Sequence, residues 1–176
     1  LKNVNKLFTG DLLKILCDMG HGDTIVIAPG DYAETEGSTQ VEVSGQTVVS
    51  HVRVIVDKPL VFRAKDMSSR PRIVGRHDTA DSGMGPAAIR GMWLTPEASG
   101  SELRGLEFVD CASGFAENTA AAGGLTSGGG VYVDGAITVV DCAFLNCRAI
   151  RGAAIILPKP TFMSFMRRSS PFYSMF

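Results

Sequence analysis

A short motif recurs in this chain, and its recurrence restricts the fold more than any other feature of the sequence. Phe108–Val109–Asp110–Cys111 matches Phe144–Leu145–Asn146–Cys147 at a spacing of 36 residues. At the same spacing Leu103 falls on Val139, which is also apolar. Self-similarity at a fixed period of about 20–50 residues is typical of solenoids and other repeat arrays.

A second repeat indicates the length of the unit. Gly128–Tyr132 matches Gly152–Ile156 at a spacing of 24 residues. The longer spacing of the first repeat is explained by an insertion in Gly114–Ser127, which is rich in Ala, Gly, Ser and Thr. A unit of roughly 24 residues with three short strands corresponds to one coil of a β-solenoid.

Short β-prone segments separated by Gly, Ser, Asp and Pro fill most of the chain. They are Asp23–Ala28, Gln40–Val43, Thr47–Val56, Leu60–Ala64, Arg72–Gly75, Ala88–Leu94, Glu102–Val109, Gly130–Val133, Ile137–Val140 and Ala153–Leu157. A doubly wound α/β fold is excluded because helical segments do not alternate with these strands. Stacked coils place like residues on like at about 4.8 Å. We therefore expect parallel stacking of Leu103 on Val139, Phe108 on Phe144 and Val131 on Ile155.

The two ends of the chain differ from the repeats. Apolar residues at a helical period from Leu7 to Met19 predict an amphipathic helix, which Gly20 and Gly22 end. Because an open solenoid end exposes unpaired strand edges, this helix is expected to cover the first coil. The predicted organisation is a capping helix in residues 1–22, parallel coils in 23–157 and an irregular, proline-interrupted tail in 158–176.

Composition narrows the function. The 176 residues carry a net charge of −1, and 45% of them are hydrophobic. Lys and Arg are scattered, so no basic footprint for nucleic acid is present. No run approaches the roughly 18 apolar residues that a membrane-spanning helix needs. The chain begins at Leu1, so a signal peptide preceding it would not be visible.

These segments resemble the pectin-lyase-like superfamily of right-handed parallel β-helix proteins. Gly22–Tyr32, which reads GDTIVIAPGDY after the predicted helix, is similar to the opening of that superfamily. Leu60–Ala64, Arg72–Gly75 and Leu103–Phe108 resemble its following coils. Gly128–Tyr132 and Phe144–Ile155 are also similar to the repeats of polymorphic outer-membrane-type surface proteins. The resemblance implies a right-handed parallel β-helix in an extracellular or surface protein.

The superfamily includes lyases, hydrolases, epimerases, adhesins and inert surface proteins, so the fold does not determine the activity. Its lyases abstract a proton next to a uronate carboxylate, using Arg or Lys as the base and often Ca²⁺ held by acidic residues. The closest local cluster, expected to bind ligand if any does, follows the strand at Arg72–Gly75 and consists of Arg72, Arg76, His77, Asp78 and Asp81. The competing interpretation is a solvated turn between coils. No cofactor is evident, and Ca²⁺ is implied only if the chain belongs to a lyase.

A second candidate row contains the polar residues Arg104, Glu107, Asp110, Asp141 and Asn146. Asp110 and Asn146 occupy equivalent repeat positions, so a polar ladder that satisfies corner backbone groups is the alternative to a binding site. Trp93 is the single tryptophan and could stack on a sugar ring. Its neighbours Met92 and Leu94 favour a partly buried strand residue instead.

Cysteine and histidine residues add little evidence for catalysis. Cys111 and Cys147 are equivalent in the repeat, which predicts either a small apolar stack or a disulfide between coils. His21 and His51 are isolated, and no Ser or Cys has an identifiable His and Asp partner.

Three hypotheses for function follow. The first is a carbohydrate-associated β-helix module of an extracellular or surface protein, with polysaccharide as its partner and no identifiable active site. The second is the N-terminal part of a polysaccharide lyase or hydrolase, and the third is an adhesin-like surface repeat. Because the charged cluster lies in a glycine-flanked loop, we expect weak or no binding of acidic oligosaccharides and no cleavage.

Overall fold

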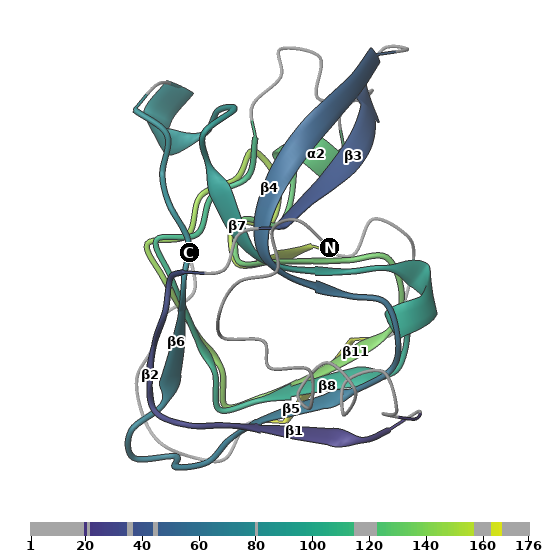
Figure 1. Cartoon of the computed structure of the whole chain (residues 1–176), viewed down its shortest axis with the longest axis vertical. Helices are drawn as coiled ribbons and strands as arrows, with labels where there is room; N and C mark the ends of the chain where they lie inside the picture. The colour runs from purple at the N-terminus through teal and green to yellow at the C-terminus, as the bar shows by residue number, and fades with distance from the viewer. Residues whose placement is uncertain are drawn as a thin grey trace.

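A computed structural model describes residues 20, 22–34, 37–43, 46–79, 81–114, 123–156 and 163–166. About half of these residues form β-strands in three sheets, and all but one of the strand pairings are parallel. The chain visits the three sheets repeatedly, so strands far apart in sequence lie side by side (Figure 1). This agrees with the predicted β-rich, parallel class.

The first sheet contains strands in the order β1 (Thr24–Ile27), β5 (Val61–Ala64), β8 (Ser101–Arg104), β11 (Ile137–Val140) and β14 (Met163–Met166). Ile25, Phe62, Leu103 and Val139 are register partners across the first four strands and belong to the core or pack against it. Strand β14 pairs in parallel with β11. These four residues therefore differ from the irregular tail predicted for 158–176.

The second sheet contains β2 (Gly30–Tyr32), β6 (Pro71–Val74), β9 (Glu107–Val109) and β12 (Ala143–Leu145), all parallel. Ile73, Phe108 and Phe144 form one row directed into the core. The rings of Phe108 and Phe144 stack with centroids 5.0 Å apart and planes 8° from parallel. Like residues therefore lie on like, as the 36-residue repeat predicted.

The third sheet contains β3 (Gly37–Val43), β4 (Gln46–Val56), β7 (Ile89–Leu94), β10 (Val131–Val133) and β13 (Ile155–Ile156). Strands β3 and β4 form an antiparallel hairpin that rises at the upper right of Figure 1. Both strands were predicted, but their hairpin was not. A connection of two residues, 44–45, joins them, and so short a connection permits antiparallel pairing while parallel pairing needs a crossover of about a dozen residues or more.

The three predicted register pairs are confirmed. Leu103 pairs with Val139, Phe108 with Phe144, and Val131 with Ile155, each between parallel strands. Described residues between 100 and 157 contain no antiparallel strand pair. The repeat therefore gives the correct register across all three sheets.

Helical structure is sparse in the described part of the chain. It consists of α2 (Gly123–Thr126) and two 3₁₀ turns, η1 (Asp81–Gly83) and η2 (Pro96–Ala98). The predicted capping helix at Leu7–Met19 lies outside the described residues and stays a prediction. Among the residues that are described, no helix has the length and apolar character needed to cross a membrane.

Polar residues occupy the tight corners between strands. Asp110, Asp141 and Asn146 have φ values of 52°, 49° and 53°. This left-handed region is costly for most side chains but accessible to Asp and Asn, whose short polar groups bond locally. Gly105, one repeat before Asp141, has φ of 70°. The same corner therefore recurs in both repeats, with Gly in one and Asp in the other.

Asp141 offers a test of this corner. Replacing Asp141 by Gly is expected to leave the free energy of unfolding within about 0.5 kcal/mol, because Gly105 fills the equivalent corner. Replacing Asp141 by Val should lower it by about 1–2 kcal/mol, since a β-branched residue is strained at this φ. Urea denaturation of the two variants measures the difference. Equal stability of the Gly and Val variants would contradict the assigned corner conformation.

Candidate binding face

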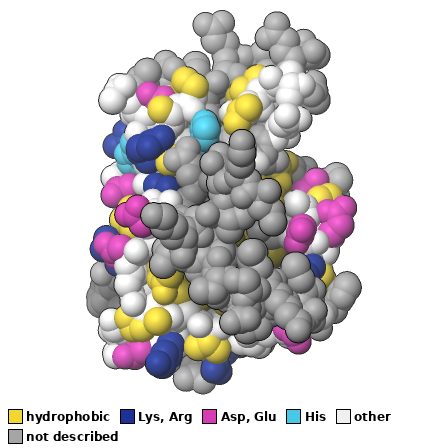
Figure 2. All heavy atoms as spheres, in the orientation of Figure 1, with side chains coloured by type: hydrophobic (Ala, Val, Ile, Leu, Met, Phe, Trp, Pro, Cys, Tyr) yellow, Lys and Arg dark blue, Asp and Glu magenta, His cyan; other side chains and the backbone are white. Residues whose placement is uncertain are grey.

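The outer face of the second sheet and its adjoining corner bring together five polar residues singled out in the sequence: Arg72, His77, Glu107, Asp110 and Asn146. Side chains alternate between the two faces of a strand. Since Ile73 and Phe108 point into the core, Arg72 and Glu107 point outward. On the side of the molecule where Figure 1 places β2 and β6, Figure 2 shows acidic, basic and histidine side chains close together.

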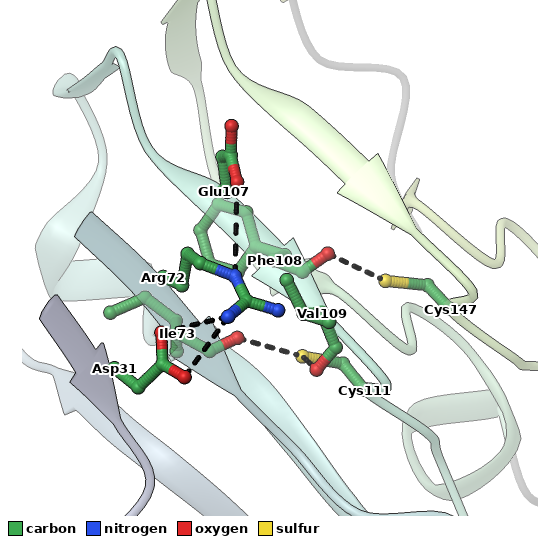
Figure 3. A network of polar contacts seen from close by, with 8 residues as sticks. All are labelled: Asp31, Arg72, Ile73, Glu107, Phe108, Val109, Cys111 and Cys147. Atoms are coloured by element: carbon green, nitrogen blue, oxygen red, sulfur yellow. Dashed lines mark hydrogen bonds and ion pairs between the residues drawn. The ribbon is translucent and has the colours of Figure 1, made fainter. Parts of the chain in front are cut away.

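A charged row crosses three neighbouring strands of this face. The Arg72 guanidinium Nη1 lies 2.9 Å and 3.0 Å from the two carboxylate oxygens of Asp31, and its Nε lies 4.0 Å from Glu107 Oε2 (Figure 3). The side chain of Arg72 is 42% exposed, that of Asp31 is 55% exposed and that of Glu107 is 27% exposed. Exposed ion pairs contribute at most about 1 kcal/mol to folding. The charged row therefore contributes little to the stability of the fold, and its side chains are accessible to a ligand.

An apolar row runs beside the charged row. Val74 pairs with Val109, and Val109 pairs with Leu145. All three point away from the core row of Ile73, Phe108 and Phe144. Leu145 is 45% exposed, Val74 is half-buried and Val109 is buried. The face thus exposes Leu145, and in part Val74, next to its charges.

A polar corner borders the apolar row on its other side. Asn146 Nδ2 donates to Asp110 Oδ1 at 2.6 Å, so the predicted stacking of these two residues is observed as a direct hydrogen bond. The His77 ring nitrogen Nε2 lies 2.8 Å from the carbonyl oxygen of Asn146. The structure thereby brings His77 of the first candidate cluster to Asp110 and Asn146 of the second.

The loop that carries His77 is held by its own backbone and side chains. Asp78 Oδ2 accepts a hydrogen bond from the amide of Ala87 at 2.7 Å, and Arg76 Nε donates to the carbonyl of Ala87 at 3.0 Å. Arg148, next to the corner, donates from Nη1 to the carbonyl of Ser82 at 2.6 Å. These bonds hold the described parts of residues 76–88 over the polar corner. The glycine-flanked sequence of this loop had suggested a less firmly held segment.

The remaining predicted residues lie elsewhere. Arg72 is in β6, whereas Arg76 follows the buried Gly75, where a Cβ would meet the carbonyl of Ile89, and forms an isolated bridge with Ile89. Arg104 is on the first sheet and pairs with Glu102 at 2.6 Å. The side chain of Asp81 lies outside the described residues. Among the described side chains of the first cluster, Arg72 contacts Asp31 and Glu107, whereas His77 contacts the polar corner.

Trp93 is on the third sheet and stacks on Tyr132, with ring centroids 4.2 Å apart. The guanidinium carbon of Arg90 lies 4.8 Å from the Trp93 centroid and 5.5 Å from that of Tyr132. Burial and the nearby charge of Asp134 raise the pKa of Tyr132, while the positive charge of Arg90 opposes this shift. Trp93 is thus engaged on its ring face by residues of the protein.

Arg90 is fully buried and was not singled out in the sequence. Its Nε donates to the carbonyl of Gly128 at 2.7 Å, Nη1 to Ser50 Oγ at 3.0 Å and Nη2 to the carbonyl of Ser127 at 2.7 Å. Burial lowers the pKa of Arg90 to about 9, so the side chain keeps its proton at neutral pH. In the sequence, Arg90 is one arginine between Ile89 and Gly91 in a β-prone segment, which is a weak signal of burial. Its burial is decided by the covering segment around Gly128, which is distant in sequence.

The face contains acidic, basic and aliphatic groups in ordered rows. Within the described ranges, no three His, Cys, Asp or Glu side chains lie close enough together to hold a metal ion. Hydrogen bonding and apolar contact are the chemistry that these rows present to a ligand.

Comparison with protein-family models, with curated proteins and with solved structures finds no match to this chain.

Proposed function

We propose that the chain is a carbohydrate-binding module with a right-handed parallel β-helix fold, belonging to an extracellular or surface protein, and that it does not cleave its ligand. The fold part of the proposal is supported by chain connectivity: parallel strands of three sheets are visited repeatedly, with like residues in register. It is also supported by the resemblance of Gly22–Tyr32 and the following segments to the pectin-lyase-like superfamily.

The observation that carries the binding function is the row order on the outer face of the second sheet. A charged row of Asp31, Arg72 and Glu107 and a polar corner at Asp110 and Asn146 lie on either side of an apolar row. Sugars have apolar C–H faces and rims of hydroxyl groups. A saccharide chain that follows the rows can place C–H groups on Leu145 and Val74 while hydroxyls bond to the flanking polar groups.

The charge balance of the face favours neutral saccharides. Two carboxylates, Asp31 and Glu107, surround one guanidinium, Arg72, and both of its neighbours in the row compete with a ligand for its donors. A uronate chain would meet a net negative row, whereas hydroxyl groups can both donate to the carboxylates and accept from the guanidinium. Neutral oligosaccharides are therefore the proposed ligands.

The test uses Leu145→Asp, which places a charge in the middle of the proposed contact. It is expected to weaken binding of soluble neutral glucan, xylan or mannan oligosaccharides at least about tenfold, since a carboxylate loses solvation against C–H groups. Isothermal titration calorimetry gives the affinity. Ile55→Asp is a matched control, because Ile55 is 43% exposed on the third sheet and Leu145 is 45% exposed on the second.

Equal loss in both variants, or no binding of any neutral oligosaccharide, would contradict the proposal. A lyase would be revealed by ultraviolet absorbance of an unsaturated product from pectate, alginate or chondroitin, with and without Ca²⁺. Turnover that disappears in Arg76→Ala or His77→Ala would replace the binding function with a catalytic one at the polar corner.

A further inference from the structure

Cys111 and Cys147 lie opposite each other on neighbouring turns of the repeat. The parallel register of β9 and β12 pairs Val109 with Leu145, and an isolated parallel bridge continues it at Ala112 and Arg148. The amide of Arg148 donates to the carbonyl of Cys111 at 2.8 Å. Register neighbours in a sheet are about 4.8 Å apart, which falls in the range of about 4.4–6.8 Å that disulfides span between Cα atoms.

The two thiols also have matching surroundings. Cys111 Sγ lies 3.5 Å from the carbonyl oxygen of Ile73, and Cys147 Sγ lies 3.5 Å from that of Phe108, one repeat further on (Figure 3). Ile73 and Phe108 are themselves register partners. The side chains are therefore displaced copies of each other on neighbouring turns of the repeat.

We propose that Cys111 and Cys147 are a redox-sensitive pair that a small-molecule disulfide, such as oxidised glutathione, converts into a disulfide linking neighbouring turns of the repeat. Both are free thiols in the structure, which represents the reduced state. The proposal rests on register alone and is independent of carbohydrate binding.

The exchange proceeds in two balanced steps. The Cys147 thiolate attacks one sulfur of oxidised glutathione, so a protein–glutathione disulfide forms, the glutathione disulfide breaks and one glutathione leaves. The Cys111 thiol then gives its proton to the second departing glutathione and attacks Cys147 Sγ. Two protein thiols are oxidised by two electrons, and one oxidised glutathione is reduced to two thiols.

The order of attack follows from exposure and charge. Cys147 is partly exposed, whereas Cys111 is fully buried. Interaction with the neighbouring Cys111 thiol lowers the pKa of the Cys147 thiol, and the same interaction together with burial raises the pKa of the Cys111 thiol. A thiolate is the attacking species, so Cys147 is the residue that meets the oxidant.

Cys142 provides a matched control in the same turn of the repeat. Its position one repeat earlier is occupied by Leu106, so no cysteine lies opposite it. Burial raises the pKa of Cys142 to about 11. It should therefore stay reduced under conditions that oxidise the pair.

The experiment equilibrates the full reduced chain in glutathione buffers of increasing oxidised fraction and blocks the remaining thiols with iodoacetamide. Peptide mapping by mass spectrometry is expected to show the peptides of Cys111 and Cys147 joined, with two of the four thiols lost. Cys142→Ser should behave as the parent chain. Cys111→Ser should instead accumulate glutathione on Cys147, since the resolving thiol is absent.

Three results would overturn the proposal. They are persistence of all four thiols in fully oxidised glutathione, a crosslink of Cys147 to Cys17 or Cys142 in the parent chain, and stable glutathione on Cys147 with Cys111 left reduced. Because the mapping is done on the parent chain, it decides the matter even if a serine variant does not fold.

Discussion

Replacing Phe108 by Ala is expected to lower the free energy of unfolding by about 3–5 kcal/mol. Phe108 is fully buried, and its ring stacks on Phe144 at 5.0 Å. The substitution removes the ring from the middle of the row that continues from Ile73 to Phe144. A rigid sheet stack on both sides limits collapse around the space that remains, so the cost should lie within this range.

Chemical denaturation followed by circular dichroism measures this loss. Leu145→Ala is the control on the neighbouring strand, and because Leu145 is 45% exposed it should cost less than about 1 kcal/mol. A double-mutant cycle with Phe144→Ala should give a coupling of about 0.5–1.5 kcal/mol for the stacked rings. A loss below about 1 kcal/mol for Phe108→Ala would show that the row is not packed as described.

Replacing Arg90 by Met is expected to cost about 3–5 kcal/mol, although methionine fills a similar volume. The change removes the donors that reach the carbonyls of Ser127 and Gly128 and the hydroxyl of Ser50. Each buried polar group that loses its partner costs about 1–3 kcal/mol. The attraction between the guanidinium and the rings of Trp93 and Tyr132 is lost as well.

Limited proteolysis distinguishes local from global effects in this variant. Cleavage near Gly124–Gly128 should be faster than in the parent chain, because Arg90 holds this segment against the third sheet through the carbonyls of Gly124, Ser127 and Gly128. Arg63→Met serves as the control, since Arg63 is exposed on β5. If both variants have the stability of the parent, Arg90 does not anchor the segment.

Much of the strand pattern could be predicted from sequence because it depends on local periodicity. Phe108 and Phe144 were paired correctly from a spacing of 36 residues, and Val131 and Ile155 from a spacing of 24. The strands Gln40–Val43 and Thr47–Val56 were also recognised. Their hairpin was missed, since the prediction extended parallel stacking to all strands and gave no weight to a two-residue connection.

The candidate site was predicted only in pieces. The stacking of Asp110 on Asn146 follows from the repeat and is observed. The first cluster grouped Arg72 with Arg76 and His77 by closeness in sequence. In the sheet, Arg72 meets Asp31 at a separation of 41 residues and also Glu107, whereas Arg76 lies beyond the end of β6 and forms a bridge with Ile89.

Sequence by itself determined the β-rich class, the strands and their register in the repeat, because alternation and period are properties of the chain read in one dimension. Only the tertiary structure decided which polar groups share a face. Insertions of unequal length separate the turns of the repeat, so residues that touch across neighbouring turns are not a constant number of residues apart in the sequence. His77 reaches the carbonyl of Asn146 over 69 residues, and Arg90 reaches Gly128 over 38. The burial of Arg90 depends on that covering segment, since a guanidinium leaves water only where a folded chain supplies carbonyls to receive it.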